Sequence, residues 1–328
     1  MRVGVVGAGA VGGAIAALLV RAGHEVEVNA RGAHLEAIRD HGIRLSGAWG
    51  DFTAKVEANE LLTRGPELVI VATKAQDAVD AIRDNQRILR NTPVLVIQNG
   101  LDSIANAQAA APRSDIVGGL AVFASSFLSP GEIRVTTAGP LYVGVMGEDD
   151  VPARYITRAL TEAIPTILTQ NFVGAQWTKL LINQVNALPA ITGLSTQDVI
   201  SNRGLRRIMT AIMREQVRIG RTTRVRFAAL QGLGPRGIRL FGIMPLALGQ
   251  VLPLLLRSGI GKTPNPGSTL QSLRRGQPTE IDFLNGAVVR AAERIHRTAP
   301  VNARLVELVH EVEKSGVFLT PDEVVARF

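Results

Sequence analysis

The N-terminal turn of the chain constrains its fold more than any other stretch. An apolar run beginning at Val3 leads directly into three glycines with the spacing Gly7-x-Gly9-x-x-Gly12, and an alanine- and leucine-rich segment follows at 14–22. This order predicts a strand, a glycine turn and a helix. Gly7 would make the tight turn, Gly9 would let the backbone approach a pyrophosphate, and Gly12 would let the helix pack against the strand. The helix N-terminus would offer unpaired N–H groups to the phosphates, so we predict a dinucleotide site, with an ordinary glycine-rich turn as the alternative.

The second predicted strand, at 24–32, indicates which dinucleotide is bound. NAD-binding sites carry an acidic residue about 20 positions after the glycines, where it binds the ribose 2′-hydroxyl. This chain has Asn29 at that place, and Arg31 follows two residues later. A carboxylate would repel a 2′-phosphate, whereas an arginine pairs with it. We therefore predict NADP(H), with a surface loop as the alternative place for Arg31, and we interpret Glu25 and Glu27 as facing away from the cofactor.

Two further apolar runs, at 67–74 and 93–100, end in polar residues. Short strands that alternate with helices predict a doubly wound parallel sheet, and such sheets bind ligands at the carboxyl ends of their strands. Lys74 could neutralise a phosphate there and Asn99 could bind the ribose or a substrate, although each could equally be an ordinary polar residue at a strand end. The other elements that we expect in this half are a small hairpin at 45–57, strands at 116–123 and 132–147, and helices at 33–40, 76–89 and 152–164.

Composition excludes several classes of site. The 328 residues suffice for two domains, and 46% hydrophobic with 20% charged residues is typical of a globular protein. The absence of cysteine rules out disulfides, a cysteine nucleophile and a thiolate metal site, and the histidines lack metal-ligand spacing. The N-terminus predicts a strand and no signal peptide, and the longest apolar run, 243–256, is too short and too interrupted by proline and glycine to span a membrane. We expect no membrane partner and a cytoplasmic location.

Charge and pattern change near the middle of the chain. Residues 1–171 carry 15 Lys and Arg against 18 Asp and Glu, whereas residues 172–328 carry 21 against 10. Strand patterns also stop near this point. We therefore predict a Rossmann-type NADP-binding domain at 1–171 and an all-helical substrate, catalytic and dimerisation domain at 172–328. The basic second half would attract an anionic substrate, and 4% aromatic residues with no nucleic-acid motif lead us to expect no nucleic-acid partner.

The first predicted helix of the second half, at 176–188, carries three polar residues on an apolar background. Lys179, Asn183 and Asn186 have the spacing i, i+4, i+7, which places them within about 60° of one another on an α-helix. Polar groups in such a place are paired or functional. A lysine beside apolar surface is a candidate proton donor with a tunable pKa, and the alternative is a lysine at the edge of the core that the asparagines cap.

The rest of the second half gives weaker signals. Arginines recur at helical spacing between 203 and 221, which is typical of a solvent-exposed face and less often of phosphate or partner binding. The apolar segment 227–260 could line a substrate cleft or form a dimer contact. Thr279 could cap a helix that reaches residue 297, and Glu280 would be favoured near its start by the helix dipole, which is a sufficient structural reason for that residue.

Several motifs recur along essentially the whole chain in an order typical of one enzyme family. They are Gly7-x-Gly9-x-x-Gly12, Arg31, Thr73-Lys74-Ala75, Gln98-Asn99-Gly100, Trp177-x-Lys179-Leu180-x-x-Asn183, Ser268-x-Leu270-Gln271 and the segment from Thr279 to Gly286. The lysine helix and the Glu280 segment are much more specific than the glycine turn. On these motifs the chain resembles the ketopantoate reductases (2-dehydropantoate 2-reductases).

The resemblance implies that a 2-oxo acid is reduced to a 2-hydroxy acid with NADPH. In the family, ketopantoate becomes pantoate on the way to pantothenate and coenzyme A. Lys179 would be the general acid that protonates the carbonyl oxygen, and a fixed ammonium would also stabilise the negative charge that hydride addition builds there. Glu280 would orient this lysine and the substrate hydroxyl beside the cofactor. The expected substrate contacts are Asn183, Asn186, Ser268 and Asn99, and the expected cofactor contacts are Gly7, Ala8, Gly9, Ala10, Val11, Gly12, Arg31, Lys74, Asn99 and Glu280.

Two departures from the family pattern leave the substrate open. The family usually has a second asparagine four residues after the one that matches Asn183, and this chain has Ala187 there, so that Asn186 is the candidate to replace it. The segment 227–260 is also longer and more apolar than the resemblance leads us to expect. A larger or more apolar 2-oxo acid is therefore the first alternative. A sensor that binds NADPH without turnover is the second, and Lys179 and Glu280 argue against it. We expect a homodimer because the second half is rich in apolar residues.

Overall fold

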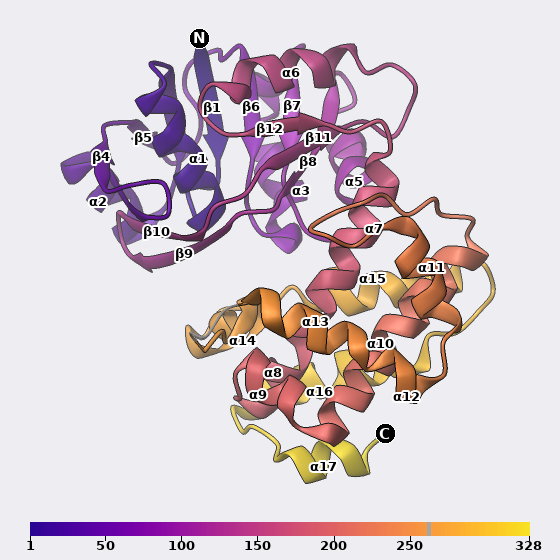
Figure 1. Ribbon diagram of the computed structural model, residues 1–328. Coiled ribbons are helices and arrows are strands. Elements are labelled where there is room, and N and C mark those ends of the chain that lie inside the picture. Colours follow the sequence, from indigo (N-terminus) through magenta and orange to yellow (C-terminus); the bar gives the residue numbers. More distant parts are fainter. Residues whose placement is uncertain (261–263) are drawn as a thin grey trace. The chain divides into compact units, whose positions relative to one another are not determined.

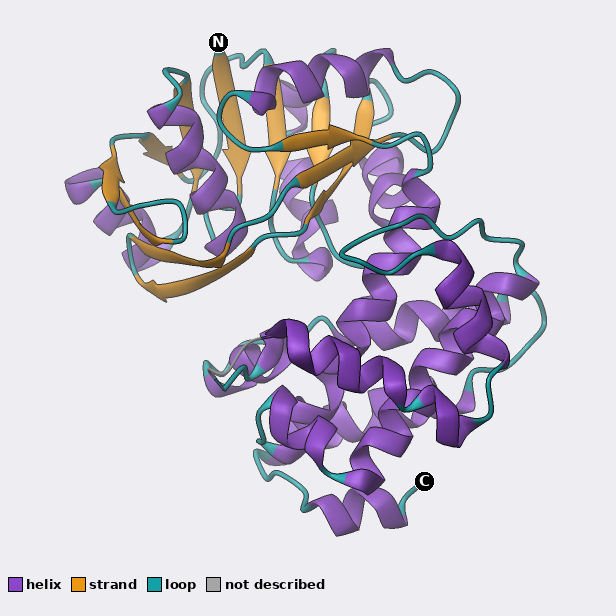
Figure 2. Ribbon diagram, in the orientation of Figure 1, coloured by secondary structure: helices purple, strands orange, loops and turns teal. Residues whose placement is uncertain are grey.

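The computed structural model describes residues 1–260 and 264–328 of the chain (Figure 1). It divides into two compact units, Met1–Phe172 and Val173–Phe328. The first unit contains sheets and helices, and the described residues of the second are helices and loops with one isolated bridge between Leu230 and Leu233 (Figure 2). The α/β class predicted for the first half and the helical class predicted for the second are therefore confirmed.

The core of the first unit is an eight-stranded sheet with the order β12-β11-β8-β7-β6-β1-β2-β5. Its strands are β1 (Arg2–Val6), β2 (Glu25–Asn29), β5 (Glu57–Asn59), β6 (Leu68–Val71), β7 (Val94–Val96), β8 (Ile116–Ala121), β11 (Leu141–Gly144) and β12 (Thr166–Leu168). All neighbouring pairs are parallel except β8 and β11, which are antiparallel. The strand order reverses between β1 and β6, and sheets of this kind bind ligands at the carboxyl ends of the strands at such a point.

Helices connect the strands of this sheet. They are α1 (Ala10–Arg21), α2 (Gly32–His41), α3 (Ala75–Asp84), α4 (Gln86–Leu89), α5 (Ser103–Ala110) and α6 (Val151–Thr161). The helix predicted at 76–89 is interrupted at Asn85, whose side chain donates to the Ala81 carbonyl at 2.9 Å and accepts from the Leu62 amide at 2.9 Å. Asparagine side chains compete with helical hydrogen bonds in this way, and here the interruption ties the helix to the loop before β6.

A second, four-stranded sheet lies on the other side of α1. It consists of β4 (Phe52–Ala54), β3 (Ile43–Gly47), β10 (Glu132–Thr137) and β9 (Ala124–Ser129), in that order. Helix α1 packs against strands of both sheets, and its residues from Gly12 to Leu19 are buried. Gly13 permits this approach, because a β-carbon there would lie 2.1 Å from Cδ1 of Ile133 on β10. The hairpin predicted at 45–57 corresponds to β3 and β4.

Strands β9 and β12 of the first unit were missing from the sequence-based prediction, as was β5, which begins at the last residue of the predicted hairpin. Strand β9 consists mainly of small and polar residues whose side chains are partly or fully exposed on both faces, so it shows no alternating pattern. Strand β12 spans only Thr166–Leu168 and directly follows Pro165. Strand β9 pairs with the next strand, β10, in a hairpin, whereas β12 pairs with β11, from which α6 separates it along the chain. A local pattern does not reveal the pairing of β12.

The second unit is built from helices. They are α7 (Phe172–Asn183), a 3-10 turn η1 (Gln184–Asn186), α8 (Ala187–Thr192), α9 (Thr196–Ser201), α10 (Arg203–Thr222), α11 (Pro235–Ile243), α12 (Leu246–Gly249), α13 (Val251–Ile260), α14 (Gly267–Arg274), α15 (Ile281–Glu293), α16 (Pro300–Ser315) and α17 (Pro321–Ala326). Helix α10 buries one side along its length, while Arg203, Arg207, Arg218 and Arg221 are exposed. The solvent-exposed face predicted for these arginines is therefore present, and the described helices include none long and apolar enough to cross a membrane.

The single helix predicted at 176–188 was wrong in its second half. Helix α7 ends at Asn183, the 3-10 turn follows, and α8 begins at Ala187. Pro189 explains the break, because its ring would clash with the carbonyl of Val185 in a continuous helix and it has no N–H to donate. Lys179 and Asn183 lie in α7, whereas Asn186, the third residue of the predicted polar face, lies in the 3-10 turn.

Candidate functional site

The glycine turn after β1 has the close backbone contacts that its sequence predicts. Gly7 has φ +93°, and a β-carbon on it would lie 2.7 Å from the Thr73 amide nitrogen. A β-carbon on Gly12 would lie 2.0 Å from the carbonyl oxygen of Gly7. Both positions therefore require glycine for the packing of the turn itself.

The middle glycine has a different environment. Gly9 is the N-cap of α1, and a β-carbon built on it would meet no heavy atom within 4 Å. The start of α1 therefore presents backbone N–H groups to open space, which suits a phosphate. Nearby, the hydroxyl of Thr73 is buried and has no hydrogen-bond partner among the described residues. These features fit the pyrophosphate of a dinucleotide.

His34 on α2 holds the turn and was missed by the sequence analysis. Its Nδ1 accepts a hydrogen bond from the Gly131 amide at 3.0 Å, so its Nε2 carries the proton and donates to the Ala8 carbonyl at 2.8 Å. The Ala8 amide in turn donates to the Asn29 carbonyl at 3.1 Å. The only sequence signal for this role was the position of the histidine three residues after Arg31.

The residues in β2 and directly after it differ in their accessibility: some make structural hydrogen bonds and one is exposed. Asn29 is buried, and its side-chain amide donates to the Glu60 carbonyl. The Glu27 carboxylate accepts hydrogen bonds from Asn59 and Thr63, and these bonds outweigh burial and lower its pKa. The side chain of Arg31 is 71% exposed and makes one ion pair at 3.4 Å with Asp84, which is 49% exposed. Such an exposed pair contributes little stability, so the guanidinium remains available to a phosphate.

The predicted residues after β6 and β7 follow strands that are parallel neighbours in the sheet. Lys74 is the N-cap of α3, and Asn99 follows Gln98, whose amide donates to the Val71 carbonyl at 2.8 Å and ties the two loops together. The turn at Gly7–Gly12, Arg31, Lys74 and Asn99 thus follow the carboxyl ends of β1, β2, β6 and β7. The structure brings the predicted cofactor residues of the first unit to one edge of the sheet.

Lys179 in the second unit is a candidate proton donor. It lies in α7, one helical turn before Asn183, and its side chain is partly buried. Burial lowers its pKa from 10.5 to about 8, although the negative charge of Glu280 acts to raise it. An ammonium group with such a pKa holds its proton at neutral pH and releases it readily.

Asn186 and Ser268 come together through the start of α14. Gly267, with φ +71°, is the first residue of that helix, and a β-carbon on it would lie 2.6 Å from Oδ1 of Asn186. Ser268 follows directly and is exposed. Asn186 therefore lies against the segment that carries another predicted substrate residue.

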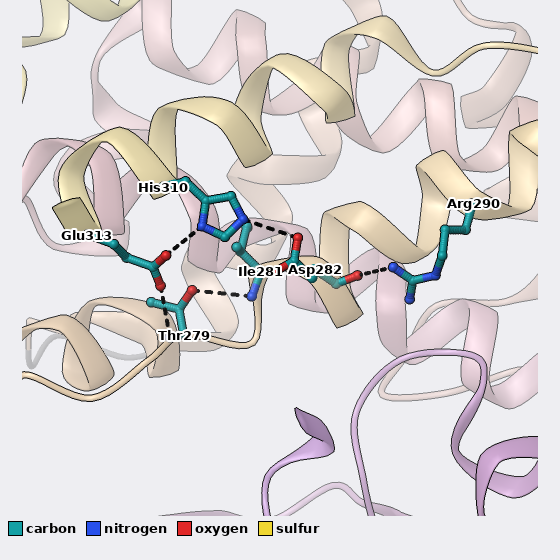
Figure 3. Close-up of polar contacts among 6 residues, drawn as sticks. All are labelled: Thr279, Ile281, Asp282, Arg290, His310 and Glu313. Atoms are coloured by element: carbon teal, nitrogen blue, oxygen red, sulfur yellow. Dashed lines mark hydrogen bonds and ion pairs between the residues drawn. The ribbon is translucent and has the colours of Figure 1, made fainter. Parts of the chain in front are cut away.

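Glu280 is the N-cap residue of α15, and a cluster of hydrogen bonds fixes its neighbours (Figure 3). Glu313 on α16 accepts from the Thr279 amide at 2.9 Å, and the Thr279 hydroxyl accepts from the Ile281 amide at 3.3 Å. His310 contacts Glu313 at 2.6 Å and Asp282 at 3.2 Å. Thr279 therefore lies one residue before the N-cap, and its hydroxyl accepts the amide of the first residue of the helix.

The chemistry that these groups can perform is proton transfer and charge stabilisation. The described residues contain no group of His, Asp and Glu side chains that could hold a metal ion. The second unit instead carries an ammonium with a lowered pKa, a carboxylate that affects it, and asparagine and serine side chains that can hydrogen-bond a polar substrate. These groups suit the protonation of a developing alkoxide.

Several known proteins with similar sequences are described as 2-dehydropantoate 2-reductases. A curated relative from Pyrococcus horikoshii, described as 2-dehydropantoate 2-reductase, is 28% identical over 319 residues and covers 96% of this chain and 99% of the relative. A relative from Archaeoglobus fulgidus with the same description is 28% identical over 319 residues, with coverages of 95% and 98%.

Solved structures share the fold. A PanE/ApbA family ketopantoate reductase from Ralstonia eutropha JMP134 is 28% identical, has a TM-score of 0.80 and covers 96% of this chain and 99% of that one. A D-mandelate dehydrogenase with NADH and anilino(oxo)acetate is 20% identical, with a TM-score of 0.82 and the same coverages.

Two family models match this sequence. The model described as Ketopantoate reductase PanE/ApbA matches residues 3–148, and the model described as Ketopantoate reductase PanE/ApbA C terminal matches residues 171–313. Together they span well over half of the chain and include both the glycine turn and the lysine helix. The chain therefore belongs to the ketopantoate reductase family and is an oxidoreductase of that family.

Proposed function

We propose that this chain reduces 2-dehydropantoate (ketopantoate) to pantoate with NADPH, a step of pantothenate and coenzyme A biosynthesis. The observation that carries the proposal is the partly buried Lys179, whose pKa is lowered to about 8 while the charge of Glu280 favours its protonated form. A general acid works best when its pKa lies near the operating pH. Relatives described as 2-dehydropantoate 2-reductase, which align over nearly their whole length, support the choice of substrate.

The first domain, which we assign to residues 1–171, would hold NADP(H). The open space at Gly9 and the N-terminus of α1 suit the pyrophosphate, and the exposed Arg31 together with Lys74 would bind the 2′-phosphate. Bound NADPH supplies the hydride. The D-mandelate dehydrogenase of similar fold holds NADH, so cofactor preference is a separate point to measure. Asn29 in place of a ribose-binding carboxylate, with Arg31 two residues later, favours NADPH.

The second domain, which we assign to residues 172–328, would bind the substrate and supply the proton. As hydride adds to the carbonyl carbon, the π electrons move to the carbonyl oxygen. This oxygen takes the proton from Lys179 Nζ, so that the carbonyl becomes a hydroxyl group. The lysine then regains a proton from water. Glu280 would orient the ammonium and the new hydroxyl beside the nicotinamide. The expected substrate contacts are Asn183, Asn186 and Ser268 from this domain and Asn99 from the first.

The test is the loss of NADPH absorbance in the presence of ketopantoate, with pantoate identified as the product. The wild type should turn over, Lys179→Ala should lose activity by about a hundred-fold or more, and both should bind NADPH equally. Lys55→Ala is the matched control, because Lys55 is an exposed lysine of the first unit, and it should keep wild-type activity. A wild type that binds NADPH but does not reduce ketopantoate would refute the assignment.

A larger or more apolar 2-oxo acid is the second candidate substrate. Ala187, where the family usually has asparagine, is only 1% exposed and contributes no polar group. Fewer fixed hydrogen-bond donors would make the site less selective for the polar ketopantoate. A panel of branched and aryl-substituted 2-oxo acids would decide between the two, since kcat/KM should be highest for the true substrate.

We also propose a homodimer formed through α11, α12 and α13. Large apolar side chains are exposed on these helices, and patches of this kind mark interaction sites. They are Leu240, Ile243, Leu248, Val251, Leu254 and Leu255. Light scattering after size exclusion should give twice the 35.0 kDa mass of the chain, and Leu255→Glu should give the monomer. The cytoplasmic location stays a prediction.

A further inference from the structure

A chain of buried amide side chains connects the helix of Lys179 to the helix of Glu280. Asn285 on α15 donates both hydrogens of its Nδ2, one to Oε1 of Gln184 at 2.5 Å and the other to Oδ1 of Asn302 at 3.0 Å. All three side chains are fully buried. Gln184 directly follows the last residue of α7, so the chain links the end of that helix to α15.

The direction of these hydrogen bonds is set by a charge at the far end. The Glu215 carboxylate can only accept hydrogen bonds, and it accepts one from Nδ2 of Asn302 at 2.7 Å. Oδ1 of Asn302 therefore points toward Asn285, which must present its amino group and so can donate to Gln184. Glu215 also accepts the backbone amides of Val301 and Asn302 in the first turn of α16, which holds it in place.

The neighbouring residue on α10 fixes α7 at a second point. Gln216 is fully buried, and its Nε2 donates to the carbonyl of Trp177 at 2.8 Å. Trp177 lies two residues before Lys179. Helix α10 thus holds α7 directly through Gln216 and indirectly through Glu215 and the amide chain.

This chain of amide side chains stabilises the fold less than apolar side chains of the same shape would. Gln184 Nε2 and Asn285 Oδ1 are buried and have no hydrogen-bond partner among the described residues. Such atoms cost free energy, and apolar side chains of the same shape would fill the space without that cost. What the amides provide is a fixed register, because a hydrogen bond is directional and an apolar contact is not.

We propose that Gln184 and Asn285 are positioning residues, whose hydrogen bond fixes Lys179 and Asn183 relative to Glu280. Lys179 lies five residues before Gln184, and Glu280 lies five residues before Asn285. The contact between the two amides therefore sets how far the lysine is from the carboxylate. The inference rests on the proposed function, in which these two groups act together.

The test compares Gln184→Met with Thr210→Val. Methionine has a similar length but does not accept the hydrogen bond, and Asn285 can still donate to Asn302. Thr210 is fully buried in α10, and within the part of the chain that the structure describes its hydroxyl donates to its own helix, to the Arg206 carbonyl at 2.8 Å. Its valine variant therefore controls for the loss of a buried hydrogen bond. Gln184→Glu keeps the acceptor oxygen and serves as the conservative variant.

Two readouts are measured on each full-length variant. The first is kcat and KM with the 2-oxo acid that the wild type reduces. The second is the titration of Lys179, followed by pH-dependent acylation and mass spectrometry with the exposed Lys55 as internal reference. The second readout needs no turnover, so it remains decisive if the wild type reduces no 2-oxo acid and the proposed function fails.

We expect Gln184→Met to lower kcat by about ten-fold or more, because small displacements of catalytic groups cost rate steeply. Its Lys179 should titrate at a lower pH than in the wild type, since Glu280 would support the ammonium less. Gln184→Glu should retain more activity than Gln184→Met, and Thr210→Val should match the wild type in both readouts. If Gln184→Met leaves both kcat and the Lys179 titration like those of Thr210→Val, the inference is overturned.

Discussion

Asn186 and Gly267 are in contact in a way that leaves no space for a side chain at position 267. A β-carbon there would lie 2.6 Å from Oδ1 of Asn186 and 3.5 Å from its Cα. Gly267 also has φ +71°, a conformation that other residues adopt only with strain. Because Ser268 follows directly, this contact places two proposed substrate residues, Asn186 and Ser268, next to each other.

We predict that Gly267→Ala impairs substrate binding as well as stability. The new methyl group must displace Asn186, so KM for the 2-oxo acid should rise by about ten-fold, while NADPH binding stays unchanged. Gly276→Ala is the matched control, because Gly276 has φ +62° and open space around its β-carbon. Both variants should lose about 1 kcal/mol of unfolding free energy to backbone strain. Equal KM values for the two variants would show that Asn186 does not contact the substrate.

The glycines of the first turn should respond differently to the same substitution. A β-carbon on Gly9 meets nothing, whereas one on Gly12 would lie 2.0 Å from the Gly7 carbonyl oxygen. We expect Gly9→Ala to keep a nearly normal melting temperature but to lose NADPH affinity, measured by fluorescence titration, because the methyl group occupies the space proposed for the pyrophosphate. Gly12→Ala should unfold at a clearly lower temperature. Wild-type NADPH affinity in a folded Gly9→Ala would argue against the cofactor position.

The contrast between these glycines also explains what sequence could predict. The strand, turn and helix around Gly7–Gly12 are contiguous in the sequence and carry a recognisable glycine spacing, so the motif alone sufficed to predict them. Pro189 is the sequence signal for the break after Asn183, because a proline removes a helical hydrogen bond and its ring clashes with the preceding turn. The contact of His34 with Ala8 joins residues 26 positions apart, and that of Gln184 with Asn285 joins residues 101 apart. Contacts of this kind depend on the tertiary fold, and no local pattern indicates them.

Arg31 should determine the choice between the two nicotinamide cofactors. Its partner Asp84 is exposed, so the ion pair contributes little to folding, and Arg31→Ser should leave the melting temperature unchanged. We expect kcat/KM for NADPH to fall by about ten-fold or more, because a charge-assisted contact to the 2′-phosphate is lost, while kcat/KM for NADH changes little. Asp84→Ser, which removes the partner but keeps the arginine, is the control. A parallel loss with both cofactors would place Arg31 outside the 2′-phosphate site.

His310 should make stability depend on pH near neutrality. Burial acts to lower its pKa, but hydrogen bonds to Glu313 and Asp282 outweigh burial and raise it above 6.5. The folded state therefore binds the proton more tightly than the unfolded state, so the stabilisation is complete below the unfolded pKa and is lost as pH rises through the folded pKa.

We expect His310→Gln to lose more stability at pH 6 than at pH 9, as measured by urea unfolding at both values. His296→Gln is the control, because His296 is the other histidine of the second unit and is exposed, so that its replacement should change the free energy of unfolding little. Since the His310 cluster fixes Thr279 and Asp282 on either side of Glu280 (Figure 3), kcat should also fall in His310→Gln. An equal loss of stability at the two pH values would contradict this account.

Lys179 should cost the protein stability at neutral pH. Below pH 8 the lysine is protonated in both the folded and the unfolded state, and the folded state bears the cost of the buried charge. Between pH 8 and 10.5 the folded state releases its proton first, so the free energy of unfolding rises with pH through this window. The full effect corresponds to at most about 3 kcal/mol.

Lys179→Met should therefore be more stable than the wild type at pH 7 and should lose both activity and this rise in stability with pH. Urea unfolding at pH 7 and pH 10 measures the first effect, because the difference between wild type and variant should shrink at the higher pH. In the wild type, kcat/KM should fall as pH rises above about 8, since the general acid must carry its proton. If the variant is less stable than the wild type at pH 7, contacts of the lysine outweigh the cost of burying its charge. If the activity of the wild type stays constant up to pH 10, Lys179 is not the proton donor.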